Sequence, residues 1–151
     1  MTKAAMTSQD GDLLQITSTV SELERVFAFI DRYCRREEVP DPVKYKLFLV
    51  AEELTMNAIS HGYSGRSDGR IAMTLRQPGD DVELSFEDEA PAFDVLRDAP
   101  DPEVDMSLTD RRLGGLGIHL LKSLSSSASY AYEGGRNVLR VTFAKGAAAY
   151  E

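Results

Sequence analysis

Hydrophobic residues recur along this chain with two different spacings, and these spacings predict its elements. Alternation of apolar and polar positions predicts strands at 12–17, 71–75, 82–86, 130–132 and 139–143. Steps of three and four predict amphipathic helices at about 20–36, 42–61 and 113–124. Strands joined by hairpins, with helices to cover one face, favour the α/β class. The expected fold is a two-layer α/β sandwich whose sheet is mixed but mostly antiparallel.

Two of the predicted helices carry capping signals at their starts. Thr19 and Glu22 have the spacing of a capping box, in which each side chain bonds the backbone of the other residue. Asp41 precedes Pro42, and this order suits an N-cap followed by the first helical turn. We therefore expect the first two helices to begin at these residues.

Segments without periodicity mark the two ends and one long internal loop. Residues 1–10 and 147–151 are expected to be tails, which leaves a single domain over 11–146. Residues from about 95 to 113 include Pro100 and Pro102 and show no clean periodicity. A loop of this length inside a compact domain is typical of a lid over a functional site.

Composition and charge limit the class of function. The 151 residues carry a formal net charge of −8, which argues against direct binding to a nucleic acid backbone. No apolar run reaches membrane-spanning length and the N-terminus lacks a signal-peptide core, so we expect no membrane association. The single cysteine, Cys34, fits a reducing compartment, and we expect a cytoplasmic protein.

A polar stripe runs along the second predicted helix. Glu53, Asn57 and His61 are four residues apart and lie beside the apolar stripe rather than opposite it. That position suits the wall of a cleft, although an ordinary helix with a few polar residues has the same pattern. A half-buried carboxylate beside a carboxamide suits a proton acceptor and a hard cation such as Mg²⁺. Glu53 is therefore a candidate general base and Asn57 a candidate metal ligand.

Two further motifs complete the pattern of a nucleotide site. Asp88 ends a predicted strand and could accept a hydrogen bond from an exocyclic amine such as that of adenine, although a lone Asp there is more often a turn residue. The segment Gly114-Gly-Leu-Gly117 opens a helix, where backbone N–H groups suit phosphates, although glycines alone could form a hinge. Arg111 and Arg112 could neutralise a transferring phosphoryl group.

At these motifs the chain resembles the GHKL ATPases and, more closely, the RsbW-type anti-sigma factor serine kinases. The matching segments are Glu53-Leu-Thr-Met-Asn57-Ala-Ile-Ser-His61-Gly-Tyr63, Asp88-Glu-Ala-Pro-Ala-Phe-Asp94, Gly114-Gly-Leu-Gly-Ile118 and Tyr130-Ala-Tyr-Glu-Gly-Gly-Arg-Asn137-Val-Leu. The resemblance covers residues from about 12 to 144 and implies the Bergerat ATP-binding fold. The family usually has a glycine where this chain has Ala90.

The resemblance also implies a role for each residue of the motifs. It makes Glu53 the catalytic base, Asn57 the Mg²⁺ ligand and Asp88 the adenine anchor. Further contacts to ATP are expected from His61, Ala90, Phe93, Gly114, Gly115, Leu116, Gly117 and Ile118. Considered without the resemblance, Phe93 would be assigned to the core.

The function that the resemblance implies is that of an ATP-dependent protein-serine kinase that doubles as an anti-sigma, partner-switching factor. The implied partners are a sigma factor or equivalent target protein, and a STAS-type anti-sigma factor antagonist whose serine receives the γ-phosphoryl group of ATP. RsbW-type proteins are typically dimers, so a homodimer is also expected. Two alternatives stay open. One is a non-catalytic module that sequesters its partner with or without nucleotide, and the other is a kinase in a signalling relay outside transcription.

Overall fold

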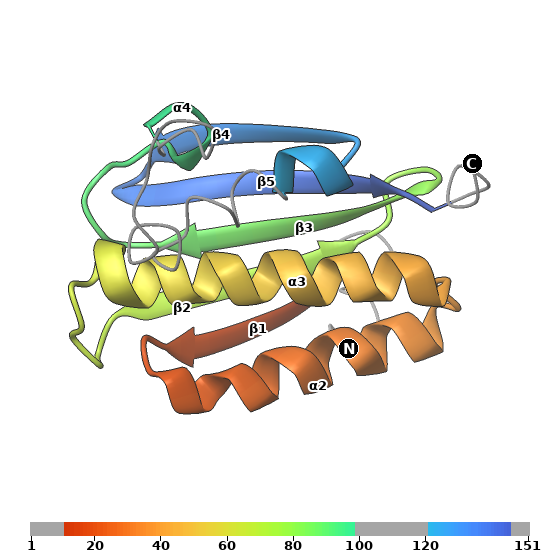
Figure 1. The fold of residues 1–151 in the computed structure, drawn as a ribbon, viewed down its shortest axis with the longest axis horizontal. Helices are drawn as coiled ribbons and strands as arrows, with labels where there is room; N and C mark the ends of the chain where they lie inside the picture. Colours follow the sequence, from red (N-terminus) through yellow and green to blue (C-terminus); the bar gives the residue numbers. More distant parts are fainter. Residues whose placement is uncertain (1–10, 99–120, 146–151) are drawn as a thin grey trace, which may run out of the picture.

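The computed structural model describes residues 11–98 and 121–145. Within these ranges the chain forms a five-stranded sheet with two long helices on one face (Figure 1). The elements are β1 (Asp12–Thr17), the 3₁₀ turn η1 (Val20–Glu22), α2 (Leu23–Arg36), α3 (Asp41–Asn57), the π-helical turn η2 (Ala58–Gly62), β2 (Arg70–Arg76), β3 (Asp81–Asp88), α4 (Val95–Asp98), β4 (Ser127–Glu133) and β5 (Arg136–Ala144).

The sheet has the strand order β1-β2-β3-β5-β4, and neighbouring strands pair antiparallel throughout. Helices α2 and α3 lie on the same face of this sheet (Figure 1). The predicted two-layer α/β sandwich with a mostly antiparallel sheet is confirmed, and no parallel pair occurs among the strands that the structure describes.

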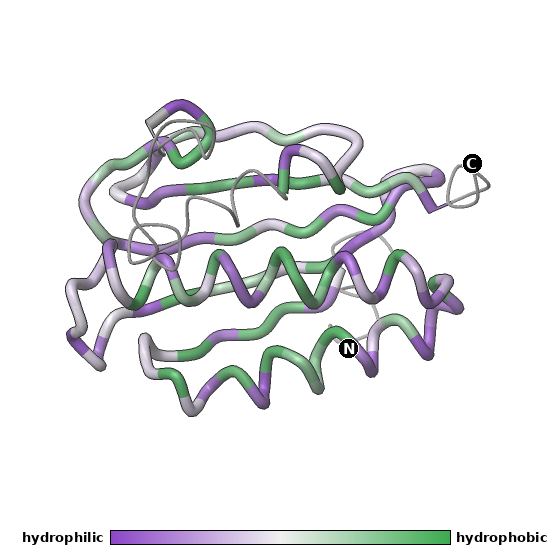
Figure 2. Tube along the Cα trace, in the orientation of Figure 1, coloured by the Kyte–Doolittle hydropathy of each residue, from purple (hydrophilic) through white to green (hydrophobic). Residues whose placement is uncertain are grey.

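Alternation along the strands decides which side chains face the helices. Ile71, Met73 and Leu75 of β2 are buried, whereas the residues between them are only partly buried. They join Ile30 of α2 and Leu47 of α3 in one hydrophobic core. Apolar and polar residues alternate in the same way along the traces in Figure 2. A one-residue slip would turn this apolar set toward solvent, so burial fixes the register of the sheet.

The helix starts differ from the predicted caps. Thr19 makes no side-chain cap bond because the 3₁₀ turn separates it from the first α-helical turn, so the predicted capping box is wrong. The Glu22 carboxylate instead accepts hydrogen bonds from the Thr17 hydroxyl at 3.2 Å and the Thr17 backbone N–H at 3.5 Å. The N-cap of α3 is Pro40 rather than Asp41, and α3 also lacks a side-chain cap bond.

The other predicted elements appear with smaller changes. The second predicted helix stays α-helical to Asn57 and continues as a π-helical turn to Gly62. The β4–β5 hairpin turns through Gly134 and Gly135, whose φ angles of 61° and 76° cost glycine little. Helix α4 begins the predicted lid at 95–113, and residues 121–124 of the third predicted helix are helical. The rest of the lid and both predicted tails lie outside the described residues. No described helix is long and apolar enough to cross a membrane.

Candidate nucleotide-binding site

Glu53 and Asn57 form the first part of the candidate site, one turn apart on α3. Both side chains are half-buried, and hydrogen bonding from the Asn57 side chain is among the causes that lower the pKa of Glu53. An ionised carboxylate can only accept, so the Asn57 amide nitrogen is the donor. This bond leaves the Asn57 carbonyl oxygen available to another group. The helix therefore presents one proton acceptor and one neutral oxygen ligand side by side.

The pKa of Glu53 is raised above its usual value of 4.5. Burial is the largest cause because it disfavours the charged form, and the nearby Glu52 charge acts in the same direction. The Asn57 hydrogen bond and the charge of His61 lower the pKa and so oppose the shift. The residues of the predicted polar stripe thus influence one another electrostatically, and burial makes the Glu53 carboxylate a stronger base.

The π-helical turn η2 carries this helix toward the strand that ends at Asp88. His61 is exposed on η2, and Tyr63 follows it as a buried residue. The Tyr63 hydroxyl donates to the backbone carbonyl of Arg70 at 2.6 Å and accepts from the backbone N–H of Glu89 at 2.6 Å. These bonds tie the end of the Glu53 helix to the residue after Asp88.

Asp88 is the last residue of β3 and is half-buried. Its Oδ1 atom accepts hydrogen bonds from the Asn137 side-chain amide at 2.8 Å and the Ala90 backbone N–H at 3.1 Å. Burial raises the pKa of Asp88, and these two hydrogen bonds oppose the rise. No described residue donates a hydrogen bond to Oδ2. One carboxylate oxygen is therefore held by the protein and the other remains for a ligand.

Asn137 is a site residue that the sequence reasoning did not identify. It lies on β5, is 8% exposed, and bonds both Asp88 and the segment that follows it. The signal was a polar residue in the inward-facing series that continues with Leu139, Val141 and Phe143. A buried carboxamide in an apolar row needs polar partners, and here they come from the end of β3.

Ala90 fits its position without backbone strain. Among the described residues, only Glu38 and Ser64 are non-glycine residues with a positive φ. The Ala90 side chain is buried, and a Cβ atom built on Gly62 would lie 3.1 Å from the Ala90 Cβ. The methyl group therefore packs against the end of η2, where Gly62 leaves room for it.

Phe93 does not belong to the core. Phe93 is 46% exposed, although its backbone N–H donates a hydrogen bond to the side-chain oxygen of Asn137 at 3.0 Å. The reading of Phe93 as a core residue is therefore wrong, and its contact with ATP stays a prediction. The other predicted residues lie outside the described ranges: Arg111, Arg112, Gly114, Gly115, Leu116, Gly117 and Ile118.

The chemistry of the donors fits a magnesium nucleotide. The described residues contain no cluster of three or more His, Cys, Asp or Glu side chains that could hold a metal ion alone. Mg²⁺ commonly takes one or two protein oxygens and completes its shell with phosphate and water oxygens. The side-chain oxygen of Asn57 has the chemistry of such a ligand, and its role in binding Mg²⁺ stays a prediction.

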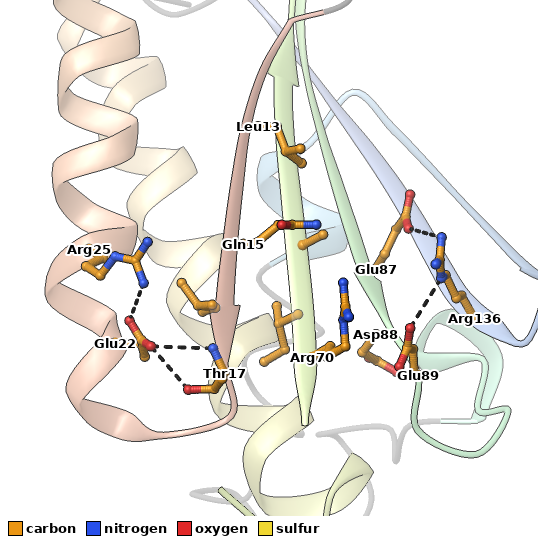
Figure 3. A pocket seen from close by; sticks show the side chains of 13 residues that line it. Leu13, Gln15, Thr17, Glu22, Arg25, Arg70, Glu87, Asp88, Glu89 and Arg136 are labelled. Atoms are coloured by element: carbon orange, nitrogen blue, oxygen red, sulfur yellow. Dashed lines mark hydrogen bonds and ion pairs between the residues drawn. The ribbon is translucent and has the colours of Figure 1, made fainter. Parts of the chain in front are cut away.

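A groove of about 510 Å³ lies on the open face of the sheet, with Glu22 of η1 and Arg25 of α2 at one edge (Figure 3). Arg25 pairs with Glu22 at 2.9 Å on one side, and Arg136 lies 3.7 Å from Glu87 and 3.6 Å from Glu89 on the other. Its lining residues are Leu13, Gln15, Ile16, Thr17, Glu22, Arg25, Arg70, Ile71, Ala72, Glu87, Asp88, Glu89 and Arg136. Glu53 and Asn57 are not among them but Asp88 is, so the groove meets the candidate site only at the end of β3.

The site combines two features. Helix α3 carries Glu53 and Asn57, and strand β3 of the antiparallel sheet ends at Asp88, whose carboxylate is hydrogen-bonded by the protein. These features define a class of ATP-binding domain. Residues 16–143 match the family described as the histidine kinase-like ATPase domain. The chain belongs to this family, and the resemblance to GHKL ATPases is confirmed.

Named relatives extend the comparison. The serine/threonine-protein kinase BtrW of Bordetella bronchiseptica is 27% identical over 135 residues, which cover 89% of this chain and 94% of that protein. The serine-protein kinase RsbW of Listeria innocua is 25% identical over 100 residues, or 64% of each chain. The closer resemblance to RsbW-type proteins is therefore confirmed.

Solved structures share the fold. The RsbU and RsbW domains of Rv1364c from Mycobacterium tuberculosis align with a TM-score of 0.56 and 16% identity. That alignment covers 87% of this chain but 32% of the other, so this chain spans about a third of that structure. The catalytic domain of the histidine kinase ThkA aligns with a TM-score of 0.53 and 12% identity, over 89% of this chain and 96% of the other.

Proposed function

We propose that this protein is a Mg-ATP-dependent protein-serine kinase that also acts as an anti-sigma, partner-switching factor. The observation that carries the proposal is the half-buried Glu53 one helical turn before Asn57, because a protein that only bound nucleotide would need no general base. The kinase names of two relatives support the same activity. The expected location is the cytoplasm.

The residues divide the reaction between them. Asp88 accepts a hydrogen bond from the adenine amine through Oδ2, and Asn57 contributes an oxygen ligand to the magnesium ion. Mg²⁺ supplies neutralisation of the phosphate charge when it is bound. Glu53 accepts the hydroxyl proton of the substrate serine while the serine oxygen forms a bond to the γ-phosphorus. The bond from that phosphorus to the β–γ bridging oxygen breaks, and ADP leaves. Arg111 and Arg112 are assigned the role of neutralising the negative charge on the phosphoryl group during its transfer.

The proposed partners are two proteins. One is a sigma factor or an equivalent target that this protein sequesters, and the other is a STAS-type antagonist that carries the acceptor serine. The net charge of −8 supports protein partners rather than direct contact with nucleic acid. Phosphorylation of the antagonist would then release it and leave the kinase free to bind its target.

We also propose a homodimer through the open face of the sheet. The support is that RsbW-type proteins are typically dimers and that this face carries both signs of charge around one groove, including Arg136, Glu87 and Glu89. Sedimentation of the wild type should give a dimer mass, and Arg136→Glu should shift it toward the monomer. A monomeric wild type at micromolar concentration overturns this part of the proposal.

The first experiment is calorimetric titration with ATP and ADP, with and without Mg²⁺. Binding that is strengthened by Mg²⁺ in the wild type, with that effect lost in Asn57→Ala, supports the nucleotide site. Transfer from labelled ATP to a co-purifying protein, lost in Glu53→Gln, supports the kinase. No binding at millimolar nucleotide, with partner capture retained, overturns the proposal in favour of a nucleotide-independent sequestering module.

A further inference from the structure

The side chain of Asn137 occupies a position that the strand register brings to the end of β3. Asn137 is the second residue of β5, directly after the turn at Gly134 and Gly135, and its register partner on β3 is Asp88. Cross-strand partners in an antiparallel sheet carry their side chains on the same face, about 5 Å apart at Cβ. The register therefore sets a carboxamide against the proposed adenine anchor.

The nitrogen of Asn137 binds only oxygen atoms. It donates to Asp88 Oδ1 at 2.8 Å and to the backbone carbonyls of Ala90 and Pro91, both at 3.1 Å. The carboxylate is thereby joined to the two residues that turn the chain away from β3. A reversed amide would place an oxygen against these three acceptors, so the orientation of the side chain is set by its surroundings.

The oxygen of Asn137 is bound from the opposite side. It accepts the backbone N–H of Phe93 at 3.0 Å and the hydroxyl of Tyr130. The Tyr130 hydroxyl also accepts the Phe93 N–H at 3.2 Å, so strand β4 supports the same carboxamide. Both ends of the amide are satisfied, and the side chain cannot turn without breaking several bonds.

We propose that Asn137 is a positioning residue for base recognition: its amide holds Asp88 so that Oδ2 alone faces the nucleotide base and selects an exocyclic amine. This inference rests on the proposed nucleotide-binding function and assigns a role to a residue beyond it. The Ala90 N–H alone, at 3.1 Å, would leave the carboxylate free to rotate about it. Asn137 supplies the second and shorter bond to the same oxygen.

The test compares two nucleotides that differ at the recognised group. ADP carries an amine on the six-membered ring of its base, and IDP carries a carbonyl oxygen there, which an ionised Asp88 repels. Calorimetric titration of the wild type at pH 7.5 should favour ADP over IDP by about tenfold or more, as expected for a hydrogen bond to a charged group. In Asn137→Ala we expect that preference to fall to about twofold through weaker ADP binding, with IDP affinity nearly unchanged.

Two further variants separate positioning from general damage. Asn137→Asp keeps the size of the side chain and the acceptor for the Phe93 N–H, but replaces the donor to Asp88 with a repelling oxygen, and should also lose the preference. Tyr130→Phe removes one bond from the opposite end of the amide and leaves all of its donor contacts, so it should keep the preference. Circular dichroism establishes that each variant is folded. If Asn137→Ala does not fold, Asn137→Asp decides.

The outcomes distinguish this inference from the proposed function. A wild type that binds neither nucleotide, or binds both equally, overturns the base anchor and this inference with it. A wild type that prefers ADP, with the preference intact in the folded Asn137 variants, overturns the inference alone. An equal loss of ADP and IDP affinity in those variants assigns Asn137 a purely structural role and likewise overturns it.

Discussion

Glu53 owes its basicity to its place on α3. Burial raises its pKa above the usual 4.5, while the Asn57 hydrogen bond and the His61 charge restrain the rise. A general base works only as the ionised carboxylate. The rate of phosphoryl transfer is therefore at its maximum at pH values above the raised pKa and falls as the pH drops through that pKa. We expect the acid limb of the kcat profile to lie above pH 4.5, the unshifted value.

Replacing His61 tests this balance. His61→Gln removes a charge that lowers the pKa of Glu53, so the acid limb should move to higher pH. His61→Lys keeps a positive charge and is the matched control, with a limb close to that of the wild type. Rates at saturating ATP and constant ionic strength separate this effect from changes in nucleotide affinity. An unmoved limb in His61→Gln would contradict the assignment.

The contact between Gly62 and Ala90 predicts a coupling between two small residues. A Cβ on Gly62 would lie 3.1 Å from the Ala90 Cβ, which is closer than ordinary van der Waals contact. Gly62→Ala should therefore destabilise the wild type by about 1 kcal/mol through overpacking, and should cost less in an Ala90→Gly background. Urea denaturation of the four proteins of the cycle should give a coupling of about 1 kcal/mol. Additive effects would show that the two sites do not touch.

The sequence was enough to pair residues that lie close together along the chain. Glu53 and Asn57 could be paired because helical spacing alone brings them together. Asn137 could not be assigned to Asp88, because their contact spans 49 positions and depends on the register of β3 with β5. That register follows from the packing of the whole inner face, which no single segment of sequence contains.

Tyr63 connects three elements at the end of the Glu53 helix. Its hydroxyl lies between the Arg70 carbonyl at the start of β2 and the Glu89 N–H after β3. Tyr63→Phe keeps the buried ring but removes both bonds, so the free energy of unfolding should fall by about 1 to 2 kcal/mol. Tyr45→Phe, at a residue that is 64% exposed, is the matched control and should change stability little. Equal stabilities of the two variants in urea would contradict a linking role for the hydroxyl.

Strands were easier to predict than helix starts in this chain. The strand segments alternate because one face is buried, and that requirement acts along the whole strand. A helix start depends on one or two hydrogen bonds, and here the Glu22 carboxylate bonds Thr17 and Arg25 instead of the backbone of Thr19. The π-helical turn at 58–62 was also unforeseen, because its sequence keeps the apolar spacing of an ordinary helix.

At the scale of the whole molecule, two candidate functional surfaces lie on opposite faces of the sheet. Glu53 and Asn57 lie on the helix that covers one face, and the groove edged by Arg25 and Arg136 lies on the other. Asp88 also lines this groove, so the open face and the candidate nucleotide site meet at the end of β3. The two-layer fold could be predicted from the sequence because the order of periodic segments allows few layer arrangements.

Nucleotide binding at this site should stabilise the whole fold, because the ligand contacts are absent in the unfolded chain. At an ATP concentration about 100 times Kd, binding adds about 2.7 kcal/mol. For a domain of this size, that corresponds to a rise in Tm of about 5 to 10 °C. Differential scanning fluorimetry of the wild type should show a larger rise with Mg²⁺ present. In Asn57→Ala the rise should no longer depend on Mg²⁺, whereas Glu53→Gln should retain the magnesium effect while losing transfer. A magnesium-dependent rise that persists in Asn57→Ala would move the metal ligand to another residue and leave the base assignment standing.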